Sequence, residues 1–204
     1  MLNKARAPIG RAVGPVVRGL ARTPLTANGL TILGTVGAVG GALVLATGRL
    51  FVGTLVVWGF VMFDLLDGQL ARARGGPTVW GALLDSTLDR VTDGAVFAAV
   101  VWHFAGDGDQ PWLAGLGLVC LVSGAVVSYV KARAEGLGLR CDVGIAERAE
   151  RLILVLVGTG LHGLGVPYVM AALLWVLAAA SVLTIAQRMA FVRAQAVALD
   201  GASQ

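Results

Sequence analysis

Charged residues are scarce in this 204-residue sequence, at 14%, while hydrophobic residues make up 57%. A soluble domain of ordinary composition is about a quarter charged. So large an apolar excess has to face something other than water, which predicts an integral membrane protein. Aromatic residues contribute only 6%, and 29 residues are glycine. Small residues let helices approach closely in lipid, which favours a closely packed helical bundle.

Cysteine is nearly absent as well, with only Cys120 and Cys141. Two isolated cysteines do not form a disulfide framework or a CxxC metal site. The net charge is +4, and the basic residues fall in patches between the apolar runs. Such patches are typical of membrane topology signals and of sites for anionic ligands, so we expect no nucleic-acid partner.

Apolar segments predict an all-α fold with six transmembrane helices, at about residues 28–47, 50–63, 79–101, 112–130, 151–161 and 168–185. They form one membrane domain over residues 23–195, followed by a short cytoplasmic tail at 196–204 that we expect to be disordered over its last five residues. Residues 1–22 mix five basic residues with apolar ones. This mixture predicts an N-terminal amphipathic helix at the membrane surface, or else a plain basic topology signal.

The distribution of basic residues predicts the orientation of this bundle. With six spans, all of the 16 lysines and arginines except Arg49 fall on the side of the N-terminus. Because positively charged loops stay inside, we expect both termini on the cytoplasmic side of the cell membrane.

Four aspartates lie inside or beside apolar runs: Asp64, Asp67, Asp85 and Asp89. Burying ionised carboxylates is costly and clustered ones repel each other, so four close together imply a cationic ligand. On helices, the spacings of three and four residues put each pair on one face. The turn predicted at Gly75-Gly76-Pro77 would make the two helices antiparallel neighbours, which brings the acidic pairs together.

Converging carboxylate oxygens suit Mg²⁺, Mn²⁺ or Ca²⁺ rather than zinc. We expect two ions, Mg²⁺ or Mn²⁺, and a two-metal site beside a polyphosphate indicates phosphoryl transfer. Gly68 would admit a ligand against the backbone, and Arg72 could hold a phosphate oxygen. The competing interpretation is interfacial pairing of the aspartates with nearby arginines, namely Arg72, Arg74 and Arg90.

These residues also form a longer pattern, Asp64-x-x-Asp67-Gly68-x-x-Ala71-Arg72 followed by Gly81-x-x-x-Asp85-x-x-x-Asp89. The pattern resembles the signature of the CDP-alcohol phosphotransferases at every fixed position. That resemblance implies a six-helix membrane enzyme that transfers a phosphate-containing group from a CDP-linked donor to an alcohol and releases CMP. It also implies that the four aspartates bind two metal ions, and that Asp89 is the general base for the acceptor hydroxyl.

The resemblance extends to the donor nucleotide. It implies that CDP-diacylglycerol is contacted at the start of the first span and around the signature, by Asn28, Gly29, Leu30, Thr31, Gly68, Arg72 and Thr78.

Several basic residues lie at cytoplasmic helix ends and could converge on an anion: Lys131, Arg133, Arg148, Arg151 and Arg188. Taken singly, each is better explained as an interfacial anchor, whereas three or more facing one cavity favour an acceptor that carries a phosphate. The segments around them resemble the phosphatidylinositol phosphate synthases of actinobacteria. This closer resemblance implies that Lys131, Arg151 and Arg188 bind the phosphate of an inositol phosphate acceptor, and that the enzyme is a homodimer.

The expected reaction is transfer of the phosphatidyl group from CDP-diacylglycerol to 1D-myo-inositol 3-phosphate. The alternative within the same family is glycerol 3-phosphate as acceptor, as in a phosphatidylglycerophosphate synthase. An alternative of another class is a non-catalytic cation channel or carrier, because acidic residues inside membranes also mark ion paths.

Overall fold

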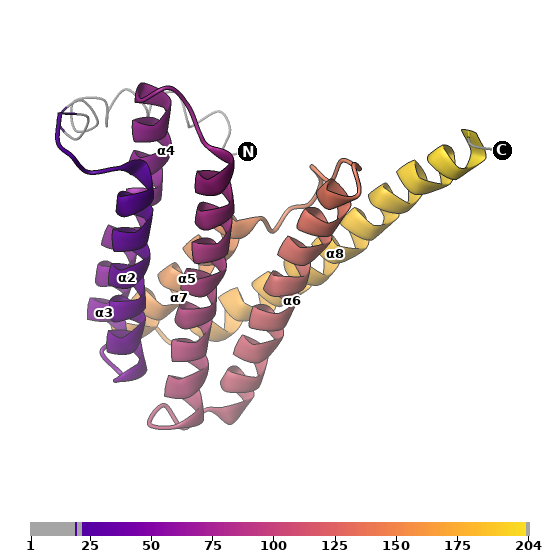
Figure 1. The fold of residues 1–204 in the computed structure, drawn as a ribbon. Coiled ribbons are helices and arrows are strands. Elements are labelled where there is room, and N and C mark those ends of the chain that lie inside the picture. The colour runs from indigo at the N-terminus through magenta and orange to yellow at the C-terminus, as the bar shows by residue number, and fades with distance from the viewer. Residues whose placement is uncertain (1–18, 20–21, 203–204) are drawn as a thin grey trace.

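The computed structural model of the protein describes residue 19 and residues 22–202 (Figure 1). Over these residues the chain forms helices and no strand, which confirms the all-α prediction. The amphipathic helix predicted for residues 1–22 lies almost wholly outside the described residues and stays a prediction.

The helices are α2 (Ala27–Ala46), α3 (Leu50–Val61), α4 (Phe63–Ala73), α5 (Val79–Ala105), α6 (Pro111–Gly136), α7 (Arg148–Gly163) and α8 (Val169–Ala202). Only Met62 separates α3 from α4, and its backbone keeps right-handed helical angles. The described helices therefore follow the predicted segments in order, with α3 and α4 together forming the second.

Four helical stretches are long and apolar enough to cross a membrane: Ala27–Ala46, Leu50–Ala73, Pro111–Gly136 and Val169–Gly201. This agrees with a membrane protein. The other two helices differ because α5 carries four charged residues between its start and its middle, at Asp85, Asp89, Arg90 and Asp93, and because α7 has only 16 residues. The count of six spans therefore stays a prediction.

Helix α2 is the centre of the N-terminal half and packs against α3, α4 and α5 (Figure 1). Its glycines make the close contact with α3 that the sequence predicts. A Cβ atom at Gly37 would overlap the ring of Phe60, and one at Gly41 would lie 2.8 Å from the backbone nitrogen of Val57. In the C-terminal half, α6 packs between α5 and α8, and α7 packs against α3 and α8.

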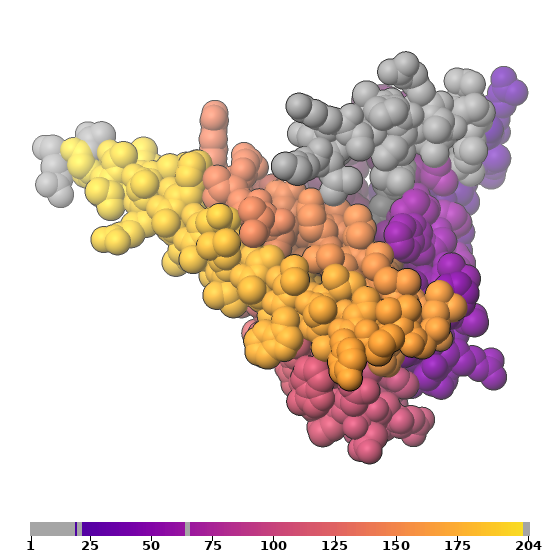
Figure 2. Space-filling model, turned by 180° about the vertical axis from the view of Figure 1, so that it is seen from behind, coloured from indigo at the N-terminus to yellow at the C-terminus, as the bar shows by residue number. Residues whose placement is uncertain are grey.

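Helix α8 is longer than expected. The sequence predicts a span ending near Ile185 and a disordered tail from Asp200, but α8 continues through Ala202. The expectation for residues 200–202 is therefore wrong. Good helix formers fill the segment after Ile185, and no glycine or proline interrupts it before Gly201. Figures 1 and 2 show the last turns of α8 projecting beyond the rest of the molecule.

Side chains of α8 hold the connection between α6 and α7 by hydrogen bonds to the backbone of that connection. Thr184 Oγ1 accepts from the N–H groups of Ile145 and Ala146, at 3.2 and 3.0 Å. The Gln195 amide accepts from Arg140 N at 3.0 Å and donates to Arg140 O at 2.8 Å. This segment, residues 137–147, is therefore held in place beside the ends of α6 and α7.

Candidate active site

The four signature aspartates are divided between two helices. Asp64 and Asp67 lie on α4, and Asp85 and Asp89 lie on α5. The side chain of Asp64 is outside the described part of the structure. Of the other three carboxylates, Asp67 is buried, Asp89 is half-buried and Asp85 is exposed. The site thus runs from the interior of the bundle to its surface.

Asp67 is held by the first turn of α2. Thr31 Oγ1 donates a hydrogen bond to Asp67 Oδ2 at 2.6 Å, and both residues are buried. A carboxylate taken out of water needs such donors, because an unsatisfied buried charge is costly. Thr31 therefore supports the acidic site, whereas the resemblance gave it a contact with the nucleotide.

The packing of α4 and α5 differs from the prediction. Among the described residues, these two helices do not pack directly against each other; both pack against α2. The α4–α5 linker passes through Gly75 and Gly76 at φ of +105° and +108°, so the helix ends there as predicted, but the chain does not fold back into a tight hairpin. Within the described side chains, no three Asp, Glu, His or Cys residues are close enough to hold a metal ion.

The residues nevertheless fit a divalent cation with a phosphate ligand. The donors are all carboxylates, which suit Mg²⁺ and Mn²⁺. At Gly68, which follows Asp67 directly, an added Cβ would meet no atom of the described residues within 4 Å. The lack of a side chain there is thus not required by helix packing, and it leaves open space beside the acidic residues. Arg72 is exposed one turn further along α4.

The predicted nucleotide contacts gather where α2 and α5 begin. Thr78 caps α5 by accepting from Gly81 N at 2.9 Å. An added Cβ at Gly81 would lie 3.1 Å from Asn28 Oδ1, so this glycine lets the start of α2 approach α5. Asn28 and Gly29 are half-buried, whereas Leu30 faces the core. The structure therefore brings Asn28 to Thr78 and Gly81, and it turns Leu30 and Thr31 inward.

A cavity of about 820 Å³ opens between α5, α6, α7 and α8. Asp89 lines this cavity. So do the three residues predicted to bind the acceptor phosphate, Lys131, Arg151 and Arg188. They come from three different helices and are up to 57 positions apart in sequence. The structure thus joins a member of the acidic signature to the downstream basic cluster.

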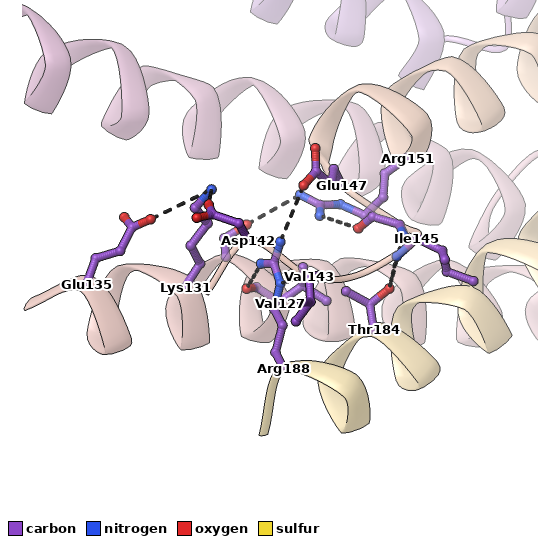
Figure 3. A network of polar contacts seen from close by, with 12 residues as sticks. Val127, Lys131, Glu135, Asp142, Val143, Ile145, Glu147, Arg151, Thr184 and Arg188 are labelled. Carbon is purple, nitrogen blue, oxygen red and sulfur yellow. Dashed lines mark hydrogen bonds and ion pairs between the residues drawn. The ribbon is translucent and has the colours of Figure 1, made fainter. Parts of the chain in front are cut away.

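Both arginines are buried and are held by polar contacts, several of them with backbone carbonyls (Figure 3). Arg188 donates from Nε to Val143 O at 2.8 Å and from Nη1 to Val127 O at 2.6 Å. Arg151 donates to Ala146 O at 3.3 Å and pairs with Asp93 at 3.0 Å. Two positive charges are therefore fixed in the cavity wall before any ligand binds.

Lys131 is more exposed than the two arginines and is paired differently. Its Nζ lies 3.3 Å from Asp142 Oδ1 and 3.7 Å from Glu135 Oε1 (Figure 3). An anionic ligand in the cavity would compete with these two carboxylates for the ammonium group. Lys131 is thus the member of the cluster whose partners are the most accessible to exchange with a ligand.

The sequence assigns no role to Asp93, and it places Arg148 only among the basic residues that could converge on an anion. The structure places both residues in the same cavity. Arg148 Nη1 lies 2.8 Å from Asp89 Oδ1, and Arg148 Nε lies 3.5 Å from Asp93 Oδ1. Arg90 also lies near Asp89, at 3.9 Å, so the predicted alternative of ion pairing holds in part for this aspartate. The spacing of four residues between Asp85, Asp89 and Asp93 was the signal that could have found Asp93.

The sequence profile of the CDP-alcohol phosphatidyltransferases matches residues 24–187. The chain belongs to this family. As a CDP-alcohol phosphatidyltransferase it is an enzyme, and the alternative of a non-catalytic cation channel or carrier does not hold. The match includes the whole acidic signature and most of the cavity, up to the residue before Arg188.

Individual members of this family are similar to the chain over most of its length. The phosphatidylinositol phosphate synthase of Mycobacteroides abscessus is 48% identical over 198 residues, which cover 96% of this chain and 90% of that protein. The phosphatidylinositol phosphate synthase of Streptomyces avermitilis is 45% identical over an alignment of 212 residues, which covers 100% of this chain and 87% of that protein. The resemblance to actinobacterial phosphatidylinositol phosphate synthases is thus confirmed.

Solved structures agree. The crystal structure of Mycobacterium tuberculosis phosphatidylinositol phosphate synthase with CDP-DAG bound matches with a TM-score of 0.85 at 48% identity, covering 89% of this chain and 94% of that one. The structure of that synthase with manganese and citrate matches with a TM-score of 0.83 at 49% identity, and 87% of each chain is covered.

Proposed function

We propose that this phosphatidyltransferase moves the phosphatidyl group of CDP-diacylglycerol to 1D-myo-inositol 3-phosphate, giving phosphatidylinositol phosphate and CMP. The observation that carries the proposal is the shared cavity of Asp89 with Lys131, Arg151 and Arg188. Three cations converging beside a carboxylate suit an acceptor that has both a phosphate to bind and a hydroxyl to activate. The names of the similar synthases support the same acceptor.

The donor half of the proposed site is the acidic signature. Asp64, Asp67, Asp85 and Asp89 would hold two Mg²⁺ ions, with Mn²⁺ as a substitute. When bound, these cations supply neutralisation of the charge on the donor pyrophosphate. The open space at Gly68 would let the pyrophosphate lie against α4, and Arg72 could hold one of its oxygens. Asn28, Gly29 and Thr78 would contact the nucleotide from the starts of α2 and α5.

In the proposed reaction, Asp89 takes the proton of the acceptor hydroxyl. The acceptor oxygen then forms a bond to the phosphorus that carries the diacylglyceryl group, and the bond from that phosphorus to the CMP oxygen breaks. Arg151 and Arg188 hold the acceptor phosphate in a fixed place, so that the hydroxyl is oriented toward the donor. Because both guanidinium groups are already fixed by contacts with the protein, little order has to be created on binding.

The proposed setting is the cell membrane, with six spans, both termini on the cytoplasmic side, and a homodimeric assembly. Most of the charged residues that line the cavity lie toward the cytoplasmic ends of the helices in this orientation, where a soluble sugar phosphate and a membrane lipid can meet. The division into a surface segment at 1–22, a membrane domain at 23–195 and a tail at 196–204 belongs to the same proposal.

The test is a transfer assay with purified protein in lipid vesicles containing CDP-diacylglycerol. CMP release is measured with either 1D-myo-inositol 3-phosphate or glycerol 3-phosphate, and Asp89→Asn serves as the inactive control. We expect metal-dependent release with the inositol phosphate and little with glycerol 3-phosphate. Turnover with glycerol 3-phosphate alone would make the protein a phosphatidylglycerophosphate synthase and overturn the acceptor assignment.

A further inference from the structure

Asp93 lies one turn beyond Asp89 on α5, is buried, and faces three arginines from two helices. Its Oδ2 is 3.0 Å from Arg151 Nη2 and 3.5 Å from Arg90 Nη2, and its Oδ1 is 3.5 Å from Arg148 Nε. The acidic signature of the sequence does not include this residue.

The charge balance of the cavity shows why a carboxylate is needed at this point. Arg151 is only 2% exposed, and a buried cation without a partner is strongly destabilising. The other contacts of Arg151 are neutral, with Ala146 O and Ser128 Oγ. Asp93 is therefore the carboxylate that neutralises Arg151, and it fixes the direction of the guanidinium group as well.

The second contact of Asp93 leads to Asp89. Arg148 bridges the two aspartates, with Nη1 at 2.8 Å from Asp89 Oδ1 and Nε at 3.5 Å from Asp93 Oδ1. The contact with Asp93 is an ion pair and not a hydrogen bond, so it links the two side chains through their charges. The chain Arg151–Asp93–Arg148–Asp89 thus connects the phosphate-binding wall of the cavity with the carboxylate at the donor side.

We propose that Asp93 is a positioning residue, which holds Arg151 in place for the acceptor phosphate and sets the position of Asp89 through Arg148. The proposal rests on the proposed function only in taking a phosphorylated alcohol as the acceptor. Asp93 faces three guanidinium groups, and these would repel a metal ion, so its role differs from that of the metal-binding aspartates.

Replacing Asp93 should therefore raise the KM for the acceptor and leave the KM for the donor nearly unchanged. Asp93→Asn keeps the size of the side chain but removes the charge that holds Arg151. We expect the KM for the phosphorylated acceptor to rise about tenfold or more, because small misplacements of a binding group are costly, while the KM for CDP-diacylglycerol stays within about twofold. Asp93→Glu, which restores the charge, should recover a large part of the loss. Asp107→Asn, in the exposed α5–α6 turn away from the cavity, is the matched control.

A double-variant cycle tests whether Asp93 acts through Arg151. In an Arg151→Gln background, replacing Asp93 by Asn should change the acceptor KM little further, because the charge it positions is already gone. Equal effects of Asp93→Asn in both backgrounds would overturn the proposal. A fall in kcat alone, with both KM values unchanged, would overturn the role of Asp93 in holding Arg151, because the acceptor phosphate would then bind as it does in the wild type.

A binding measurement separates this proposal from the assignment of the acceptor. The full-length protein is treated with a chelator, and its thermal unfolding is followed with 1D-myo-inositol 3-phosphate or with glycerol 3-phosphate. We expect the acceptor that the enzyme uses to raise the Tm of the wild type and of Asp107→Asn, but not of Asp93→Asn at the same concentration. If glycerol 3-phosphate is the ligand that protects, the proposed function fails and the role of Asp93 holds. If Asp93→Asn is protected as well as the wild type, the role of Asp93 fails.

Discussion

Thr31 Oγ1 lies 2.6 Å from Asp67 Oδ2, and this buried hydrogen bond joins the first turn of α2 to the acidic face of α4. The same hydroxyl lies 3.0 Å from Ala27 O, but it has a single proton, and the shorter contact is the one to the carboxylate. The helix that packs against both α4 and α5 therefore also orients an aspartate of the proposed metal site.

Replacing Thr31 by Val should weaken metal binding. The change keeps the shape of the side chain and removes the donor to Asp67, and the loss of such a supporting contact typically costs about 10- to 100-fold in metal affinity. The measurement is the Mg²⁺ concentration that gives half-maximal CMP release. Thr31→Ser keeps the hydroxyl and is the control. An unchanged metal requirement in Thr31→Val would mean that Thr31 does not support metal binding.

Gly68→Ala should impair the reaction without lowering the stability of the protein. Within the part of the chain that the structure describes, no atom lies within 4 Å of the added methyl group, and Ala is favoured over Gly in a helix by about 1 kcal/mol. We therefore expect an unchanged or higher Tm together with a large rise in the KM for CDP-diacylglycerol. Gly115→Ala on α6, which also meets no neighbour, controls for the general effect of the substitution. A donor KM equal to that of the wild type would mean that the space at Gly68 is not used by the substrate.

Asp89→Asn should abolish transfer without loss of the fold. Removing a general base lowers the rate by about 10²- to 10⁴-fold. The amide keeps an oxygen near Arg148, so we expect CDP-diacylglycerol still to bind and the Tm to change little. The rate is read as CMP release in a single turnover, and donor binding is measured separately. Near-normal turnover would remove Asp89 as the base.

Lys131 and Asp142 should give opposite changes in the KM for the acceptor. Lys131→Gln removes a charge-assisted contact with the acceptor phosphate, which is worth about 1.5 kcal/mol or more, so the KM should rise about tenfold. Asp142→Asn removes a competing partner at 3.3 Å from Lys131 Nζ. Exposed ion pairs contribute up to about 1 kcal/mol, so the KM should fall by a factor of up to about five. A rise in both variants would mean that Asp142 organises the pocket instead of competing with the substrate.

Much of the local structure could be predicted from the sequence, because apolar runs and helix breakers act within a few residues. The helix boundaries at Thr47, Arg74 and Thr78 follow from such signals. The acidic signature with its fixed glycines also identified the family that the comparison confirms.

Contacts between distant segments could not be predicted in the same way. The sequence suggests that α4 and α5 pack as a hairpin, whereas each packs against α2, because helix packing is decided by the whole bundle. For the same reason the sequence does not predict that Arg148 reaches Asp89, or that Asp93 neutralises Arg151. Both contacts join residues more than 55 positions apart.

Helix α8 holds the segment between α6 and α7 in a way that depends little on the side chains of that segment. Thr184, Arg188 and Gln195 bind this segment mainly through its peptide groups, and the side chain of Glu147 adds an ion pair with Arg188 at 3.9 Å. Substitution of the exposed residues Arg140 and Ile145 should therefore leave most variants functional. Cys141 and Ala146 are exceptions because they are buried, and so is Gly144, whose φ is +126° and where an added Cβ would collide with Thr184. The backbone shape of residues 137–147 is therefore set largely by α8, and the exposed positions of this segment are open to substitution.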